Sequence, residues 1–110
     1  MRFRVIAAAT VIIAASSVSA QAQDGMASLH AQQRVGGKVC MTSHFHNGQS
    51  TNAPSRKAAE MAAIRDWTGF TAWEYGGAWA NFQLAASKSM KCSQSGSTWG
   101  CNVEARPCRR

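Results

Sequence analysis

Two histidines separated by one residue offer the clearest candidate chemistry in this sequence. His44 and His46 follow Cys40, and in an extended strand all three side chains would point to one face. Imidazoles at this spacing can share a zinc, copper or nickel ion. Two ligands make an incomplete site, however, and His30 could add a third only if the N-terminal side folds back. We therefore assign no cofactor, and the alternative to metal binding is a pair of solvated strand histidines.

Few side chains in this sequence could act as a general acid or base. Beyond the N-terminal signal described below, the carboxylates are Asp24, Glu60, Asp66, Glu74 and Glu104. On one helix Glu60 and Glu74 would lie about 21 Å apart, whereas paired glycosidase carboxyl groups lie within about 5–9.5 Å. The sequence also contains no nucleophile elbow and no phosphate-binding loop. We therefore expect a protein that is not an enzyme.

Three arginines close the sequence and could form an anion-binding cluster. Arg106, Arg109 and Arg110 surround Cys108, which we expect to be anchored by a disulfide. Guanidinium groups bind phosphate and carboxylate through paired N–H donors. The net charge of +7, or +5 once Arg2 and Arg4 are lost with the signal, favours contact with anionic surfaces, but no basic run exceeds two residues, so we expect no specific nucleic acid partner. The alternative is a solvated, mobile C-terminus.

The N-terminal 22 residues have the plan of a cleaved secretory signal. Arg2 and Arg4 precede an uncharged run at residues 5–18, and small residues then allow cleavage after Ala20 or Ala22. The apolar run has about 14 residues, which is shorter than the roughly 20 that a transmembrane helix needs. The mature protein should therefore be periplasmic or secreted, with no transmembrane span.

The exported part is short for a protein domain, so covalent cross-links should matter. We expect a signal peptide at residues 1–22, a flexible lead-in at residues 23–37 and a single domain at residues 38–110. The interior of so short a domain gives little margin over chain entropy.

Four cysteines fit disulfides in an oxidising compartment. Their spacing contains no C-x2-C pair, which disfavours a zinc finger. If Gly96 begins a two-residue hairpin turn, Cys92 faces Cys101 in a non-hydrogen-bonded pair, where side chains approach most closely. That pairing leaves Cys40 with Cys108, although four cysteines allow three arrangements.

Periodicity predicts the elements that position these residues. Residues 38–46 alternate as one strand, residues 47–52 are rich in turn formers, and residues 54–75 are typical of a helix. Residues 78–86 fit either a short helix or a strand. Residues 87–106 are expected to form a hairpin.

Burial of one helix face against the strands defines the expected fold. The apolar half of the helix comprises Met61, Ala63, Ile64, Trp67, Phe70 and Tyr75. The hairpin residues that share the face of the Cys92–Cys101 bridge and would meet this helix are Met90, Trp99, Val103 and Ala105. Trp73 projects away from the main stripe. The result is an α+β fold, a small two-layer β-α-β-β domain with one helix on an antiparallel sheet, stapled by disulfides.

Several stretches resemble small exported proteins of alphaproteobacteria. The similarity covers about residues 38–110 and lies in the stretches 59–67, 70–76, 92–101 and 105–108. These motifs are structural. The resemblance therefore implies a Gram-negative envelope setting and brings no activity or site residue with it.

Export, disulfides, a positive charge and few catalytic groups together suggest a function. We expect a small non-enzymatic protein of the bacterial envelope that binds an anionic envelope component or another envelope protein. One alternative is a small exported enzyme or enzyme inhibitor with an active patch near His44 and His46. Another is a weakly metal-binding protein that uses the same two histidines.

Overall fold

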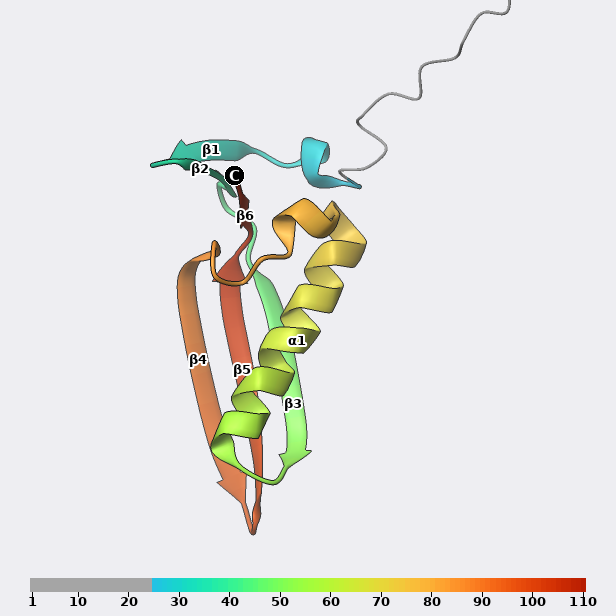
Figure 1. Cartoon of the computed structure of the whole chain (residues 1–110), viewed down its shortest axis with the longest axis vertical. Helices are drawn as coiled ribbons and strands as arrows, with labels where there is room; N and C mark the ends of the chain where they lie inside the picture. The colour runs from blue at the N-terminus through green and yellow to red at the C-terminus, as the bar shows by residue number, and fades with distance from the viewer. Residues whose placement is uncertain (1–24) are drawn as a thin grey trace, which may run out of the picture.

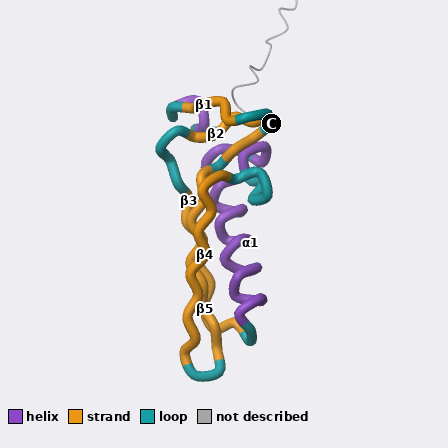
Figure 2. The backbone as a smooth tube through the Cα atoms, turned by 90° about the vertical axis from the view of Figure 1, so that its left-hand side faces the viewer, coloured by secondary structure: helices purple, strands orange, loops and turns teal. Residues whose placement is uncertain are grey.

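The main body of the protein is a three-stranded antiparallel sheet with one long helix across one face (Figure 1). A computed structural model of the chain describes residues 25–110, so the expected signal peptide at residues 1–22 lies outside the described residues. The sheet has the order β3–β5–β4, and the side view shows the helix and the sheet as two layers (Figure 2). The elements of this body are β3 (His46–Ala53), α1 (Arg56–Tyr75), β4 (Ala86–Ser95) and β5 (Thr98–Arg106). Their order along the chain confirms the expected β-α-β-β domain.

A second, smaller sheet lies at the C-terminal end of the helix (Figure 1). Its order is β1–β2–β6, and all of its pairs are antiparallel. Short 3-10 turns, η2 and η3, lie before β1 and after α1. The bounds of these elements are η2 Ala27–Leu29, β1 Gln32–Val35, β2 Lys38–Met41, η3 Gly77–Trp79 and β6 Cys108–Arg109. Within residues 25–110, no helix combines the length and apolar character needed to cross a membrane.

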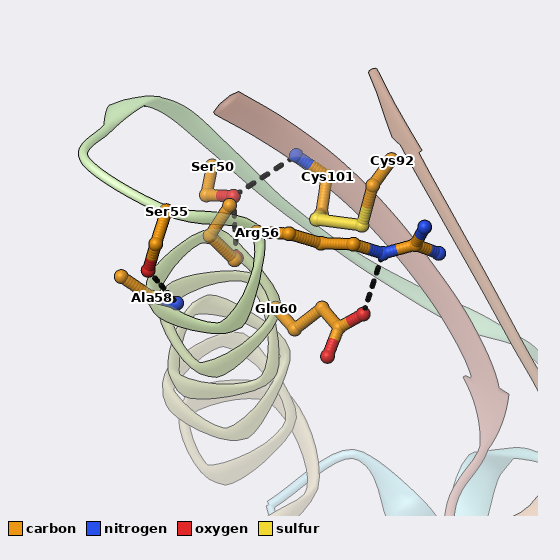
Figure 3. The surroundings of a disulfide bond; sticks show 8 residues. Ser50, Ser55, Arg56, Ala58, Glu60, Cys92 and Cys101 are labelled. Atoms are coloured by element: carbon orange, nitrogen blue, oxygen red, sulfur yellow. Dashed lines mark hydrogen bonds and ion pairs between the residues drawn. A yellow bond between two sulfur atoms is a disulfide. The ribbon is translucent and has the colours of Figure 1, made fainter. Parts of the chain in front are cut away.

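The helix begins and ends with clear local signals. The side chain of Ser55 accepts a hydrogen bond from the backbone N–H of Ala58 at 3.1 Å, which caps the N-terminus (Figure 3). Gly76 ends the helix with a φ of +96°, a conformation that favours glycine. The expected helix at residues 54–75 is thus confirmed to within two residues.

The buried stripe of the helix differs from the expected apolar half. It runs at every fourth residue through Ala59, Ala63, Trp67, Thr71 and Tyr75. Two residues expected inside are largely in solvent, Met61 at 54% and Phe70 at 44% exposed. The prediction was wrong there because the helix lies close to the strands and small residues fill much of the contact.

The hairpin has the expected register. Ser95 pairs with Thr98 across the turn, Cys92 pairs with Cys101, and Gly96 has a φ of +61°. The disulfide between Cys92 and Cys101 is present, as is the one between Cys40 and Cys108.

A single serine ties the hairpin disulfide to the helix. The Ser50 hydroxyl of β3 accepts from the backbone N–H of Cys101 at 3.1 Å and donates to the carbonyl of Ala59 at 2.6 Å (Figure 3). One side chain therefore links β3, β5 and the first turns of α1 at this end of the molecule.

The strand expected at residues 38–46 is two strands in the structure. β2 ends at Met41, and β3 begins only at His46 and continues through the stretch that was expected to be turn-rich. The inner face of β3 carries His46, Gly48 and Ala53, which are buried although none is large and apolar. Because these residues are small or polar, β3 lacks the alternation of large apolar residues that predicts a strand from sequence.

The lead-in expected at residues 23–37 also needs correction. Residues 32–35 form β1, which pairs with β2 in a hairpin whose turn is Gly36-Gly37. All four β1 residues are exposed, so the strand has no buried face to mark it in the sequence. The undecided segment 78–86 contains the end of η3, a turn and the start of β4.

Two separate cores hold the layers together. The larger core lies between α1 and the β3–β5–β4 sheet and includes the expected hairpin residues Met90, Trp99, Val103 and Ala105. The smaller core lies under the second sheet and contains Ala27, Met41, Tyr75 and Trp79.

Candidate functional site

Three segments that are distant in sequence bring potential metal ligands together at the C-terminal end of α1. His30 follows the η2 turn, His44 lies in the connection between β2 and β3, and Glu74 is the last residue but one of the helix. One ring nitrogen of each histidine and one carboxylate oxygen all lie within 4.8 Å of one another. All three residues are half-buried. This cluster is the candidate site.

The two histidine rings of the cluster are in direct contact. The centroids of His30 and His44 lie 4.0 Å apart, and His30 Nε2 lies 3.9 Å from Glu74 Oε1. Ligand atoms on a tetrahedral zinc ion lie about 3.4 Å apart. Side-chain rotations that move these ligand atoms by about an ångström would therefore bring all three within bonding distance of one ion.

A buried pair of side chains lies behind the carboxylate. His46 is 3% exposed and Thr71 is fully buried, and His46 Nδ1 lies 2.8 Å from Thr71 Oγ1. With the Thr71 hydroxyl donating to Nδ1, the proton of the imidazole is on Nε2. That atom lies 3.2 Å from Glu74 Oε2, without hydrogen-bond geometry. A small rotation of Glu74 would let His46 hold the carboxylate from behind, as outer residues hold ligands in metal sites.

Aromatic side chains lie against the cluster and against His46 behind it. Burial, and secondarily the charge of nearby Glu74, raises the pKa of Tyr75 well above its usual range, so its hydroxyl stays protonated. This hydroxyl lies 2.6 Å from His44 Nδ1, a hydrogen-bond distance that orients the ring and leaves its second nitrogen free. The ring of His46 lies between Tyr75 and Phe70, with centroids 4.6 Å and 4.7 Å away.

His46 should make the metal-free protein sensitive to acid. Burial lowers the pKa of His46 below its ordinary value of 6.5, the nearby His44 and His30 add to this effect, and Glu74 opposes it. The unfolded chain therefore binds a proton more readily than the folded protein, and the free energy of unfolding falls as pH drops below about 6.5. We expect the urea midpoint of metal-free protein to fall between about pH 7.5 and about pH 5.5.

The control for this pH effect is His46→Gln, which keeps polar groups at the same place without titrating. Its urea midpoint should fall less over the same pH range. Equal pH dependence in the two proteins would contradict the assignment to His46.

Two of the three C-terminal arginines have aromatic partners. The guanidinium carbon of Arg106 lies 4.8 Å from the ring centroid of Phe45, and that of Arg109 lies 5.3 Å from the ring of Trp79. Arg110 is exposed at the end of the chain. Each of the two stacked arginines is therefore engaged by a separate ring, and the geometry gives the anion-binding interpretation less support than the histidine cluster receives.

His44 and His46 were expected from the sequence as candidate ligands, with His30 as a third if the N-terminal side folds back, whereas Glu74 was not expected as a ligand. His44 is in the cluster, whereas His46 stands behind it, and Glu74 was considered only as a distant partner of Glu60. The signal that could have placed His30 is the Gly36-Gly37 turn, because a hairpin about this turn brings His30 toward His44.

Comparison with known proteins adds no further assignment: the chain matches no protein-family model, no curated protein and no solved structure.

Proposed function

We propose that this protein is a small exported protein that binds one divalent transition-metal ion through His30, His44 and Glu74. The observation that carries the proposal is the convergence of their ligand atoms to within 4.8 Å from three separate segments. Two imidazole nitrogens and one carboxylate oxygen suit zinc, copper and nickel. Magnesium and calcium fit less well, because both prefer a shell made largely of oxygen atoms.

The surroundings of the cluster support binding rather than a chance contact of polar residues. The buried Nε2 atom of His46 has no hydrogen-bond partner and lies next to Glu74 Oε2. A buried polar atom without a partner is costly, and it gains one when Glu74 turns to a metal ion. Tyr75 meanwhile orients His44. Tyr75 therefore holds one of the three ligands, and His46 is placed to hold a second once Glu74 turns to the ion.

The expected compartment is part of the same proposal. All four cysteines form disulfides, which is compatible with a periplasmic or extracellular location. The sequence of residues 1–22 supports export. A protein in that setting meets metal ions that enter or leave the cell envelope, and we infer that it binds them there.

Titration of untagged, chelator-treated protein with Zn²⁺, Cu²⁺ and Ni²⁺ tests the proposal. Calorimetry should show one ion per chain, with Mg²⁺ giving no comparable heat. The variants His30→Ala, His44→Ala and Glu74→Gln should each bind at least about tenfold more weakly, since each removes one of three protein ligands.

Glu60→Gln is the matched control, because Glu60 is on the same helix and its contact is with Arg56 at the opposite end. Its affinity should equal that of the natural sequence. Unchanged affinity in all three ligand variants, or no binding of any of the three ions, would overturn the proposal.

A further inference from the structure

We propose that the Cys40–Cys108 disulfide controls the metal site, so that the ion binds tightly only after this bond has closed. The inference rests on the proposed metal-binding function and adds its regulation. The physical basis is that the disulfide fixes two of the ligands relative to the third. In a reducing compartment the ligands would be present but not held together.

Two of the ligands move as one unit because a hairpin joins them. β1 and β2 pair from Val35↔Lys38 to Gln32↔Met41, and the backbone N–H of Thr42 extends the ladder by donating to Ala31 at 2.9 Å. His30 and His44 lie just beyond the open end of this hairpin, where their rings meet. Their mutual position therefore depends mainly on this local pairing, and Tyr75 also orients the His44 ring.

The third ligand, Glu74, belongs to the main body of the molecule and not to the β1–β2 hairpin. Glu74 is on α1, which packs on the β3–β5–β4 sheet. For all three ligands to reach one ion, the β1–β2 hairpin has to stay fixed against the end of the helix. The geometry of the site thus depends on what joins the hairpin to the main body.

The Cys40–Cys108 bond is a covalent link across this junction. Cys40 is in β2, and Cys108 follows the central strand β5 after only one residue, Pro107. Around it, β2 pairs with β6 at just two positions, and the Met41 N–H donates to the Pro107 carbonyl at 3.0 Å. The exposed β1 strand adds no buried side chain to this junction. Without the disulfide, the hairpin would be held by this short pairing, by the small core and by three hydrogen bonds, which join Lys38 Nζ to the Leu84 carbonyl, the Met26 N–H to the Glu74 carbonyl, and Tyr75 to His44. The disulfide is the covalent cross-link among these contacts.

The Cys40–Cys108 bond forms by thiol–disulfide exchange. The thiols of Cys40 and Cys108 lose two electrons and two protons, and a disulfide of an oxidising exchange partner becomes two thiols. Such partners act in the compartments where exported proteins fold. Export would therefore assemble the metal site at the time the protein reaches its place of work.

The second disulfide supplies a control in the same molecule. Cys92–Cys101 lies beside the first turns of α1 (Figure 3), where Ser50 links Cys101 to Ala59, and Ala59 is about 22 Å along the helix from Glu74 at about 1.5 Å per residue. It staples the β4–β5 hairpin and joins neither of the segments that carry His30 and His44. Its loss should leave the site geometry unchanged.

Zinc affinity is compared in the oxidised protein, in the double variant Cys40→Ser/Cys108→Ser and in Cys92→Ser/Cys101→Ser. Serine is used so that freed thiols do not act as ligands. The Cys40→Ser/Cys108→Ser variant should bind zinc at least about tenfold more weakly than the natural sequence. The Cys92→Ser/Cys101→Ser variant should bind within about twofold of it. Far-UV circular dichroism establishes that each variant retains its helix.

A measurement on the unaltered protein makes the test independent of variant folding. By linkage, zinc must oppose reduction of the disulfide by the same factor by which the disulfide favours zinc. In a glutathione redox buffer with zinc bound, half reduction of Cys40–Cys108 should need an about tenfold higher [GSH]²/[GSSG] ratio, and Cys92–Cys101 should be unaffected. Alkylation and peptide mapping read the two bonds separately.

The outcomes separate the two proposals. If the oxidised protein binds zinc but neither the Cys40/Cys108 variant nor the reduction of that bond shows coupling, the regulation is wrong and the metal site stands. If zinc protects both disulfides equally, the effect is global stability and the regulation is again wrong. If the oxidised protein binds no ion, both proposals fail.

Discussion

Replacing Trp67 with alanine is expected to lower the free energy of unfolding by about 3–5 kcal/mol. Trp67 is fully buried at the centre of the larger core, where its ring meets Phe82 edge-on at 5.3 Å. Its indole N–H donates to the carbonyl of Ala105 at 3.2 Å, which joins α1 to the central strand. Small domains are typically stable by about 5–10 kcal/mol, so this change would remove much of the total. Urea unfolding followed by circular dichroism gives the value.

Trp67→Phe separates the hydrogen bond from the packing. It keeps a ring in the core but leaves the Ala105 carbonyl without its donor, and we expect a loss of about 1–3 kcal/mol. If Trp67→Ala costs no more than Trp67→Phe, then the ring itself contributes little and the larger core is not what holds the two layers together.

The part of the fold that followed from local rules could be predicted from the sequence. The hairpin register came from counting outward from Gly96, and it placed Cys92 opposite Cys101 as the structure has them. The helix followed from Pro54 at its start, its alanine content and the Gly76-Gly77 stop. In both elements the determining interactions lie within a few residues of one another, so no knowledge of tertiary contacts was needed.

The edge strand β3 could not be predicted, because small and polar residues occupy the positions where large apolar residues usually mark a strand. Gly48 and Ser50 face the helix where larger apolar residues would be expected, and each has a specific contact with it. Similarly, the buried helix stripe uses Ala59, Ala63 and Thr71 rather than Met61. Close approach of two backbones selects small residues, and small residues give a hydrophobic-periodicity analysis little to detect.

The candidate site could be predicted from the sequence only in part, for a related reason. His44 drew attention because a second histidine lies two residues away, whereas His30 and Glu74 are brought to it by tertiary structure. β1 is fully exposed, so no pattern of burial marked the strand that returns His30 to the site. Ligands that depend on long-range pairing become apparent only once the topology is known.

Replacing Gly48 with alanine is expected to cost about 3 kcal/mol or more, although it adds only one methyl group. A Cβ atom at this position would lie 2.6 Å from the Trp67 backbone nitrogen and 2.8 Å from its Cβ, and it would also meet the carbonyl of Ala63. Backbone atoms of a helix cannot yield as a flexible side chain can. The helix would have to move away from β3.

That movement should also reach the candidate site. His46 is two residues before Gly48 on the same face of β3, and Thr71 and Glu74 are one to two turns beyond Trp67. A helix displaced at Gly48 would therefore lengthen the His46–Thr71 contact and carry Glu74 away from His44. We expect Gly48→Ala to weaken zinc binding as well as to destabilise the fold, under conditions where the variant is still folded.

Gly69→Ala is the matched control, since it makes the same chemical change on the outer side of the helix. A Cβ there would meet nothing within 4 Å, and alanine is favoured over glycine inside a helix by about 0.5–1 kcal/mol. Gly69→Ala should therefore raise the urea midpoint and leave zinc affinity unchanged. If Gly48→Ala were instead tolerated like Gly69→Ala, helix and strand would not lie as close as the structure has them, and the alignment of Glu74 with His44 would lose its support.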